Sequence, residues 1–126
     1  MACLRILVVD DDADTANLVR VICEMDGHEA VSLTSGVAAL ETVRTFSPHV
    51  GIFDIAMPGM SGLELAAAVR REAQHTHLIA LSGWARAEDA ARSLAAGFHA
   101  HLAKPLSIDE LRARLRTIEP ARASAC

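Results

Sequence analysis

Cysteine is scarce and widely spaced in this sequence. The three cysteines are Cys3, Cys23 and Cys126, an odd number with no CxxC pair. Small secreted domains are usually held by an even set of closely spaced cysteines, and zinc sites need clustered ones. A disulfide framework and a zinc site are therefore not predicted. We expect reduced thiols and a cytoplasmic protein.

Long apolar runs and an excess of basic residues are also missing. No run approaches the roughly 18 apolar residues of a membrane span, and the N-terminus has no signal-peptide pattern. Lysine and arginine number 12 against 16 acidic residues, for a net charge of −4, whereas nucleic-acid binders need clustered basic side chains. We expect this chain to bind neither nucleic acid nor membrane.

The length and composition favour one globular domain. The chain has 126 residues, of which 52% are hydrophobic, enough for one buried core. We expect a domain over residues 1–119 and a short tail over residues 120–126.

Short apolar runs alternate with helical patterns along the chain. The runs predict strands at Leu4–Val9, Glu29–Leu33, His49–Phe53, His77–Leu81 and Phe98–Ala103. The helical patterns lie near residues 13–25, 37–46, 61–72, 86–96 and 107–118. In the first of them, Leu18, Val21, Ile22 and Met25 form the expected apolar stripe. Five strand–helix units predict an α/β fold, a parallel sheet with right-handed crossovers and helices on both faces.

Two common folds of this size have that element order. One is the flavodoxin-like, doubly wound five-stranded sheet of order 2-1-3-4-5 with five helices. The other is half of a dinucleotide-binding fold, which needs a glycine-rich turn after the first strand. Here that turn reads Asp10-Asp-Asp-Ala-Asp14 and would repel a dinucleotide phosphate. The flavodoxin-like sheet is the prediction.

Polar side chains follow the strands where such sheets bind ligands, at their carboxyl ends. They are Asp10 and Asp11 after the first strand, Asp54 after the third, Ser82 after the fourth and Lys104 after the fifth. Converging carboxylates need a cation, and hard oxygen ligands suit Mg²⁺. A carboxylate can also accept a phosphoryl group, whose three oxygens would go to the metal, to a lysine and to a hydroxyl. The set therefore predicts Mg²⁺-assisted phosphoryl transfer.

Four sequence blocks carry a family resemblance. Residues 6–12 (ILVVDDD), 53–62 (FDIAMPGMSG), 78–83 (LIALSG) and 101–105 (HLAKP) resemble, in order and spacing, the response-regulator receiver domains of two-component signalling. The match extends from Leu4 to about Ile118. The stretches 80–84 and 97–105 look most like receivers attached to hybrid sensor histidine kinases.

The resemblance implies a histidine-to-aspartate phosphorelay. Asp54 would accept a phosphoryl group from a histidine kinase or a histidine phosphotransfer domain. Asp11 and Asp54 would bind Mg²⁺ directly, Asp10 through water and Ala56 through its backbone carbonyl. Ser82 and Lys104 resemble the switch hydroxyl and the lysine of the family. Such a domain is not an ordinary enzyme, although it catalyses its own phosphorylation and dephosphorylation.

The family also implies an output surface, formed by the last two strands and the last two helices, that switches on phosphorylation. A dimer is one assembly that the resemblance allows. No motif identifies the cognate kinase, the pathway or the output.

The sequence departs from the family pattern at three positions. Ala56 stands where many relatives carry a polar side chain, Trp84 lies two residues after Ser82, and His101 replaces a frequent aromatic residue. The first two positions flank the acceptor and bear on the dephosphorylation rate. The histidine pairs at 75/77 and 99/101 are interpreted as surface polar positions rather than metal ligands.

Two other functions share part of this pattern. A phosphatase of the haloacid-dehalogenase type needs Asp-x-Asp after a strand, which Asp10 and Asp12 satisfy, but no later acidic pair follows a strand. A non-phosphorylated interaction module with the receiver fold predicts lost acidic or lysine positions, and here none is lost.

Overall fold

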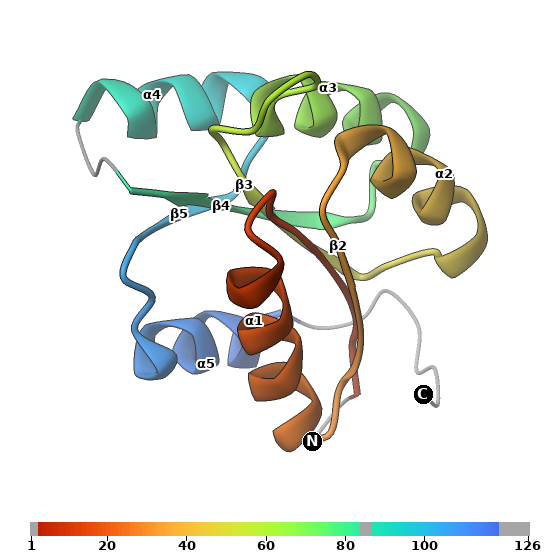
Figure 1. Ribbon diagram of the computed structural model, residues 1–126, viewed down its shortest axis with the longest axis vertical. Helices are drawn as coiled ribbons and strands as arrows, with labels where there is room; N and C mark the ends of the chain where they lie inside the picture. The colour runs from red at the N-terminus through yellow and green to blue at the C-terminus, as the bar shows by residue number, and fades with distance from the viewer. Residues whose placement is uncertain (1–2, 84–86, 119–126) are drawn as a thin grey trace.

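A computed structural model gives the fold of residues 3–83 and 87–118, with residues 87–90 described by their main chain only (Figure 1). Strands and helices alternate along the whole described chain. The strands are β1 (Arg5–Val9), β2 (Glu29–Leu33), β3 (Val50–Asp54), β4 (His77–Ser82) and β5 (Ala100–Ala103). The helices are α1 (Ala13–Met25), α2 (Gly36–Phe46), α3 (Gly62–Glu72), α4 (Ala87–Ala96) and α5 (Ile108–Arg116). The predicted succession of elements is confirmed, with boundaries shifted by one or two residues.

The strands form one parallel sheet of order β2-β1-β3-β4-β5. This is the predicted flavodoxin-like arrangement. The order reverses beside β1, because the chain moves from β1 outward to β2 and then returns to β3 on the other side. The carboxyl ends of β1 and β3 are therefore adjacent, and a crevice for ligands is expected there.

Helices cover both faces of the sheet, with α1 and α5 on one side and α2, α3 and α4 on the other (Figure 1). Alternate residues of each buried strand face the two layers. Ile6 and Val8 of β1 therefore join the core beneath α1 and α5, while Leu7 and Val9 join the core beneath α2 and α3. Two apolar cores thus hold the central strands from both sides.

Local sequence explains where the helices begin. Ser61 accepts a hydrogen bond from the Glu64 N–H, and the Glu64 side chain accepts one from the Ser61 N–H, which is the predicted capping box. Ser107 caps α5 by accepting from the Glu110 N–H. Both caps fix helices that follow residues of the predicted site.

The buried face of α1 differs from the predicted stripe. Ile22 is buried, but Leu18, Val21 and Met25 are exposed, and Met25 keeps 72% of its surface accessible. The buried face is formed by Ile22 together with the smaller residues Ala16, Val19 and Cys23. Small side chains let α1 lie close to the sheet, which turns the longer ones outward.

The cysteines also differ in part from expectation. Cys23 is free and buried, whereas Cys3 is disulfide-bonded, so the prediction of reduced thiols is wrong at Cys3. Among the described helices, none has the length and apolar character needed to cross a membrane.

Candidate functional site

The predicted site residues all lie at the carboxyl edge of the sheet. Asp10 and Asp11 directly follow β1, and Asp54 is the last residue of β3. Ser82 ends β4, and Lys104 follows β5, where its N–H donates to the Ser82 carbonyl at 2.8 Å. Residues distant in sequence are thus assembled by strand order alone.

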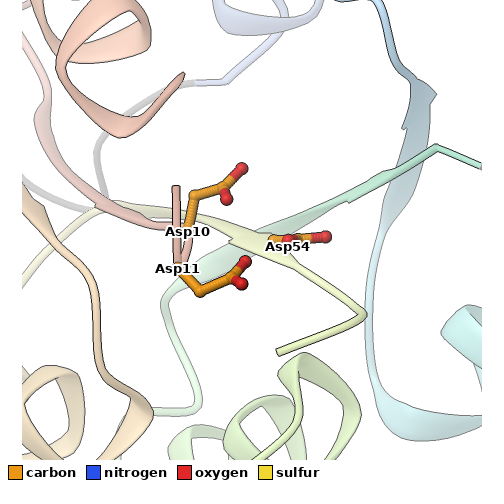
Figure 2. Close-up of side chains that lie close together, drawn as sticks. All are labelled: Asp10, Asp11 and Asp54. Carbon is orange, nitrogen blue, oxygen red and sulfur yellow. The ribbon is translucent and has the colours of Figure 1, made fainter. Parts of the chain in front are cut away.

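Three carboxylates converge at this edge. Asp10, Asp11 and Asp54 each present an oxygen within 4.8 Å of the others. Figure 2 shows the three side chains pointing the same way from the ends of β1 and β3. Asp10 is fully buried and Asp54 is 4% exposed, whereas Asp11 is exposed. One carboxylate therefore faces solvent at the mouth of a cluster whose other members are buried.

Lys104 is the cation of the cluster. Its Nζ lies 2.7 Å from Asp10 Oδ2 and 3.4 Å from Asp54 Oδ2. Burial lowers the pKa of Lys104, but its bonds to the two aspartates outweigh that effect and raise the pKa above the usual value. The lysine is therefore charged at neutral pH.

Asp54 is electrostatically unfavourable as a carboxylate. Burial, and then the charge of Asp10, raise the pKa of Asp54 to about 6, although Lys104 and the Ala56 N–H oppose the rise. The Ala56 N–H donates to Asp54 Oδ1 at 3.3 Å. A bound cation would relieve the repulsion between Asp54 and Asp10.

The first turn after β1 separates the roles of its three aspartates. Asp10 Oδ1 accepts from the Asp12 N–H at 2.9 Å, which fixes the side chain that holds Lys104. Asp12 is exposed, caps α1 by accepting from the Asp14 N–H and binds the Thr15 hydroxyl at 2.8 Å. Its bond to Thr15 lowers the pKa of Asp12. Asp12 is thus a helix cap, and it does not join the acidic cluster.

The structure brings together Asp10, Asp11, Asp54 and Lys104, as predicted. The Ala56 main chain lies against the Asp54 carboxylate, and buried Ser82 stands at the adjoining strand end. The sequence did not predict the close pairing of Lys104 with Asp10. It also gave no separate role to Gly62, the last residue of the 53–62 block, whose backbone lies against that of Asp54. Trp84 lies outside the described residues.

This fold and site define a class: a doubly wound α/β domain with an acidic cluster and a lysine at the switch point. The sequence matches the response regulator receiver domain over residues 6–116. The chain therefore belongs to the response regulator receiver domain family.

Similar sequences include named response regulators. The chain is 37% identical over 113 residues to a 14.6 kDa protein of the sodA1 3′ region of Leptolyngbya boryana, covering 88% of this chain and 86% of that one. It is 30% identical over 112 residues to the DNA-binding response regulator MtrA of Mycolicibacterium paratuberculosis, covering 89% of this chain and 49% of MtrA. The chain spans about half the length of MtrA. The DNA binding in that name is therefore stated of MtrA and not of this chain.

Similar solved structures include a receiver domain and a chemotaxis protein. The Francisella response regulator 1452 receiver domain superposes with a TM-score of 0.84 at 31% identity, over 90% of this chain and 94% of that one. The Vibrio cholerae chemotaxis protein CheY4 gives a TM-score of 0.87 at 28% identity, over 94% and 100%. The closer resemblance to receivers of hybrid kinases stays a prediction.

Proposed function

We propose that Asp54 is the phosphoryl acceptor of this receiver domain, within a histidine-to-aspartate phosphorelay. One observation carries the proposal: a buried carboxylate at the switch point has the Lys104 ammonium 3.4 Å away and two more carboxylates close by. The proposed partner is a histidine kinase or a histidine phosphotransfer domain. We further propose that the domain occupies residues 1–119 and the tail residues 120–126.

The acidic cluster fits a divalent cation. Its donors are all hard oxygens, their spacing allows a single ion, and exposed Asp11 leaves a path for entry. In the proposal Asp11, Asp54 and the Ala56 carbonyl bind Mg²⁺ directly, and Asp10 binds through water. The bound ion would offset the negative charge of the carboxylates and of the incoming phosphoryl oxygens.

The side chains of the site then have separate tasks. An Asp54 oxygen attacks the phosphorus of a phosphohistidine, an O–P bond forms, and the N–P bond breaks with its electron pair going to the imidazole. Lys104 neutralises a phosphoryl oxygen, and the Ser82 hydroxyl donates to another. Asp10 keeps Lys104 beside the acceptor, because Asp10 is buried and fixed by the Asp12 N–H.

The proposed output follows from the position of Ser82. Ser82 ends β4, and the Lys104 main chain after β5 binds its carbonyl. A phosphoryl group at Asp54 would draw the hydroxyl inward and bias the surface formed by β4, α4, β5 and α5 between two arrangements. The cytoplasmic location and a dimer remain predictions.

The alternative functions lack this support. A haloacid-dehalogenase-type phosphatase needs the second acid of Asp10-x-Asp12 in the site, and here that acid is exposed and caps a helix. Asp109 and Glu110 lie in the first turn of α5, not at a strand end. A non-phosphorylated module would not need a lysine held against a buried acidic pair.

Acetyl phosphate or phosphoramidate with Mg²⁺ tests the proposal. Intact-mass analysis should show one added phosphoryl group on the wild type and none on Asp54→Asn. Asp12→Asn is the matched control, because it changes an aspartate of the same edge outside the cluster, and it should still be labelled. Equal labelling of Asp54→Asn would refute the assignment, and turnover of a small phosphate ester would favour the phosphatase.

A further inference from the structure

The loop that follows the acceptor is held between two helix N-termini. It runs from residue 55 to residue 61, between the end of β3 and the start of α3. At its start the Ile55 N–H donates to the Leu81 carbonyl at 3.0 Å, and the Ile55 carbonyl accepts from the Gly62 N–H at 3.0 Å. The loop therefore leaves the acceptor on β3 and closes back on the main chain of Ile55.

Gly62 permits that closure. It is the buried first residue of α3. A Cβ atom on Gly62 would overlap the carbonyl oxygen of Asp54 and would lie 2.8 Å from the Ile55 Cα, closer than real side chains come. Any larger residue would push the N-terminus of α3 away from the acceptor. The glycine thus sets the distance between α3 and the main chain of Asp54.

Gly36 makes a similar approach from another helix. It is the buried first residue of α2, and a Cβ there would lie 3.0 Å from Met60 Cβ and 3.2 Å from the Met60 carbonyl oxygen. Met60 belongs to the far end of the same loop. The contact is tight but less severe than at Gly62, so a methyl group would shift the loop rather than prevent folding.

Neither glycine has a functional group. Each contributes by lacking a Cβ atom, which lets the helix N-terminus lie close to the loop. The segment between them contains Ala56, whose N–H binds Asp54 Oδ1 and whose carbonyl is a proposed metal ligand. Moving either end of so short a loop moves that segment relative to Asp10 and Asp11, which are fixed at the end of β1. Misplacement by a fraction of an ångström is costly for metal binding and phosphoryl transfer.

We propose that Gly36 and Gly62 are positioning residues for the acceptor: the N-termini of α2 and α3 hold the 55–61 loop so that Asp54 and the Ala56 carbonyl face the acidic cluster. The inference rests on the proposed function. It gives α2, which supplies no residue to the site, a part in setting the site's geometry.

The test compares Gly36→Ala and Gly62→Ala with Gly27→Ala. Gly27 has a φ of +88°, and a Cβ placed on it would have nothing within 4 Å, so its substitution strains the backbone far from the loop. It is a control for lost stability alone. Calorimetric titration with Mg²⁺, well below each melting temperature, gives the dissociation constant of the folded protein. The initial rate of phosphorylation by phosphoramidate at saturating Mg²⁺ measures the phosphoryl-transfer step separately from Mg²⁺ binding.

Gly36→Ala should weaken Mg²⁺ binding about tenfold and slow phosphorylation, as changes behind a metal ligand generally do. Gly62→Ala should be more severe, and if it does not fold, Gly36→Ala decides. Gly27→Ala should melt earlier but bind Mg²⁺ with wild-type affinity. Unchanged affinity and rate in folded Gly36→Ala, or equal losses in Gly27→Ala, would overturn the inference. A wild type that binds no Mg²⁺ and takes no phosphoryl group would instead refute the proposed function.

Discussion

Acidification should weaken the amino-terminal edge of the sheet, where three histidine rings accept hydrogen bonds from the main chain. His28, His49 and His99 each lie directly before the first residue of a strand. Their Nδ1 atoms accept from the N–H groups of Leu4, Arg5 and Leu78, at 3.1, 2.8 and 3.0 Å. A ring nitrogen can accept such a bond only while it is unprotonated.

The surroundings of the rings favour the neutral form. Burial lowers the pKa of His28 despite the nearby charge of Asp26. Burial also lowers the pKa of His49, with help from Arg5, and that of His99, with help from Arg70. His77 stacks on His99 with ring centroids 4.4 Å apart. Burial, then His99 and the arginines Arg114 and Arg70, lower the pKa of His77 to about 4.

The direction in which stability changes with pH follows from proton binding. Below a pH of about 6.5 the unfolded chain takes up protons that the folded chain does not, so stability falls as the pH drops from about 6.5 towards the folded pKa values. Each such proton costs about 1.4 kcal/mol per pH unit, and the four rings with lowered pKa values give an upper bound of about 5.5 kcal/mol per pH unit. Because the rings are partly exposed and screened by solvent, we expect roughly 1–2 kcal/mol per pH unit.

The assay must remove Asp54, because its protonation changes the stability in the opposite direction to that of the histidines. Asp54 has a raised pKa, so its protonation in the folded state adds stability as the pH falls through about 6. Urea unfolding of Asp54→Asn between about pH 7.5 and 5.5 isolates the histidines. His49→Asn should flatten the slope, while substitution of exposed His75 by Gln should leave it unchanged. A flat profile in Asp54→Asn, or equal slopes with and without His49, would refute the reasoning.

Three further predictions concern the acidic cluster. Asp54→Asn should raise the unfolding free energy at pH 7 by about 1–2 kcal/mol without Mg²⁺, because a buried charge is lost; a less stable variant would contradict this. Mg²⁺ at ten times its dissociation constant should add about 1.4 kcal/mol, seen as a melting shift of a few degrees that Asp11→Asn abolishes; a shift retained in Asp11→Asn would count against the site. Lys104→Met should cost about 2–3 kcal/mol by leaving Asp10 buried and unpaired, and adding Asp10→Asn should restore most of it in urea unfolding; additive losses would show that the pair is not coupled.

Much of the fold could be predicted because each element has a local cause. The apolar run before Asp10 and the Ser61 capping box need no tertiary information to be recognised. Strand order then follows from a small set of allowed topologies, and with it the convergence of Asp10, Asp11 and Asp54. Site residues at strand ends are therefore the most predictable part of this molecule.

Features that depend on close packing could not be predicted. Periodicity favours the stripe through Leu18 and Met25 as the core face of α1, but the sheet selects the smaller face with Ala16 and Val19. Periodicity shows that a helix has an apolar face, not how near its neighbour lies. The preference of Lys104 for Asp10 over Asp54 likewise depends on sub-ångström placement.

The hydrogen bonds of the histidine rings could not be predicted from the sequence either. Their spacing indicates polar surface positions, and His99 is exposed, yet its ring accepts a bond from the Leu78 main chain. A hydrogen bond between a side chain and the backbone of another strand leaves no signal in sequence spacing.

The buried thiol of Cys23 allows the free energy of separating α1 from the sheet to be measured. Burial raises the pKa of this thiol to about 12, so the reactive thiolate is scarce in the native state. A thiol reagent can modify Cys23 only after α1 has moved off the sheet. The labelling rate, compared with that of the unfolded chain, gives the free energy of that opening. Because α1 begins shortly after Asp10, the same rate measured with and without Mg²⁺ would report how far repulsion at the acidic cluster loosens the helix.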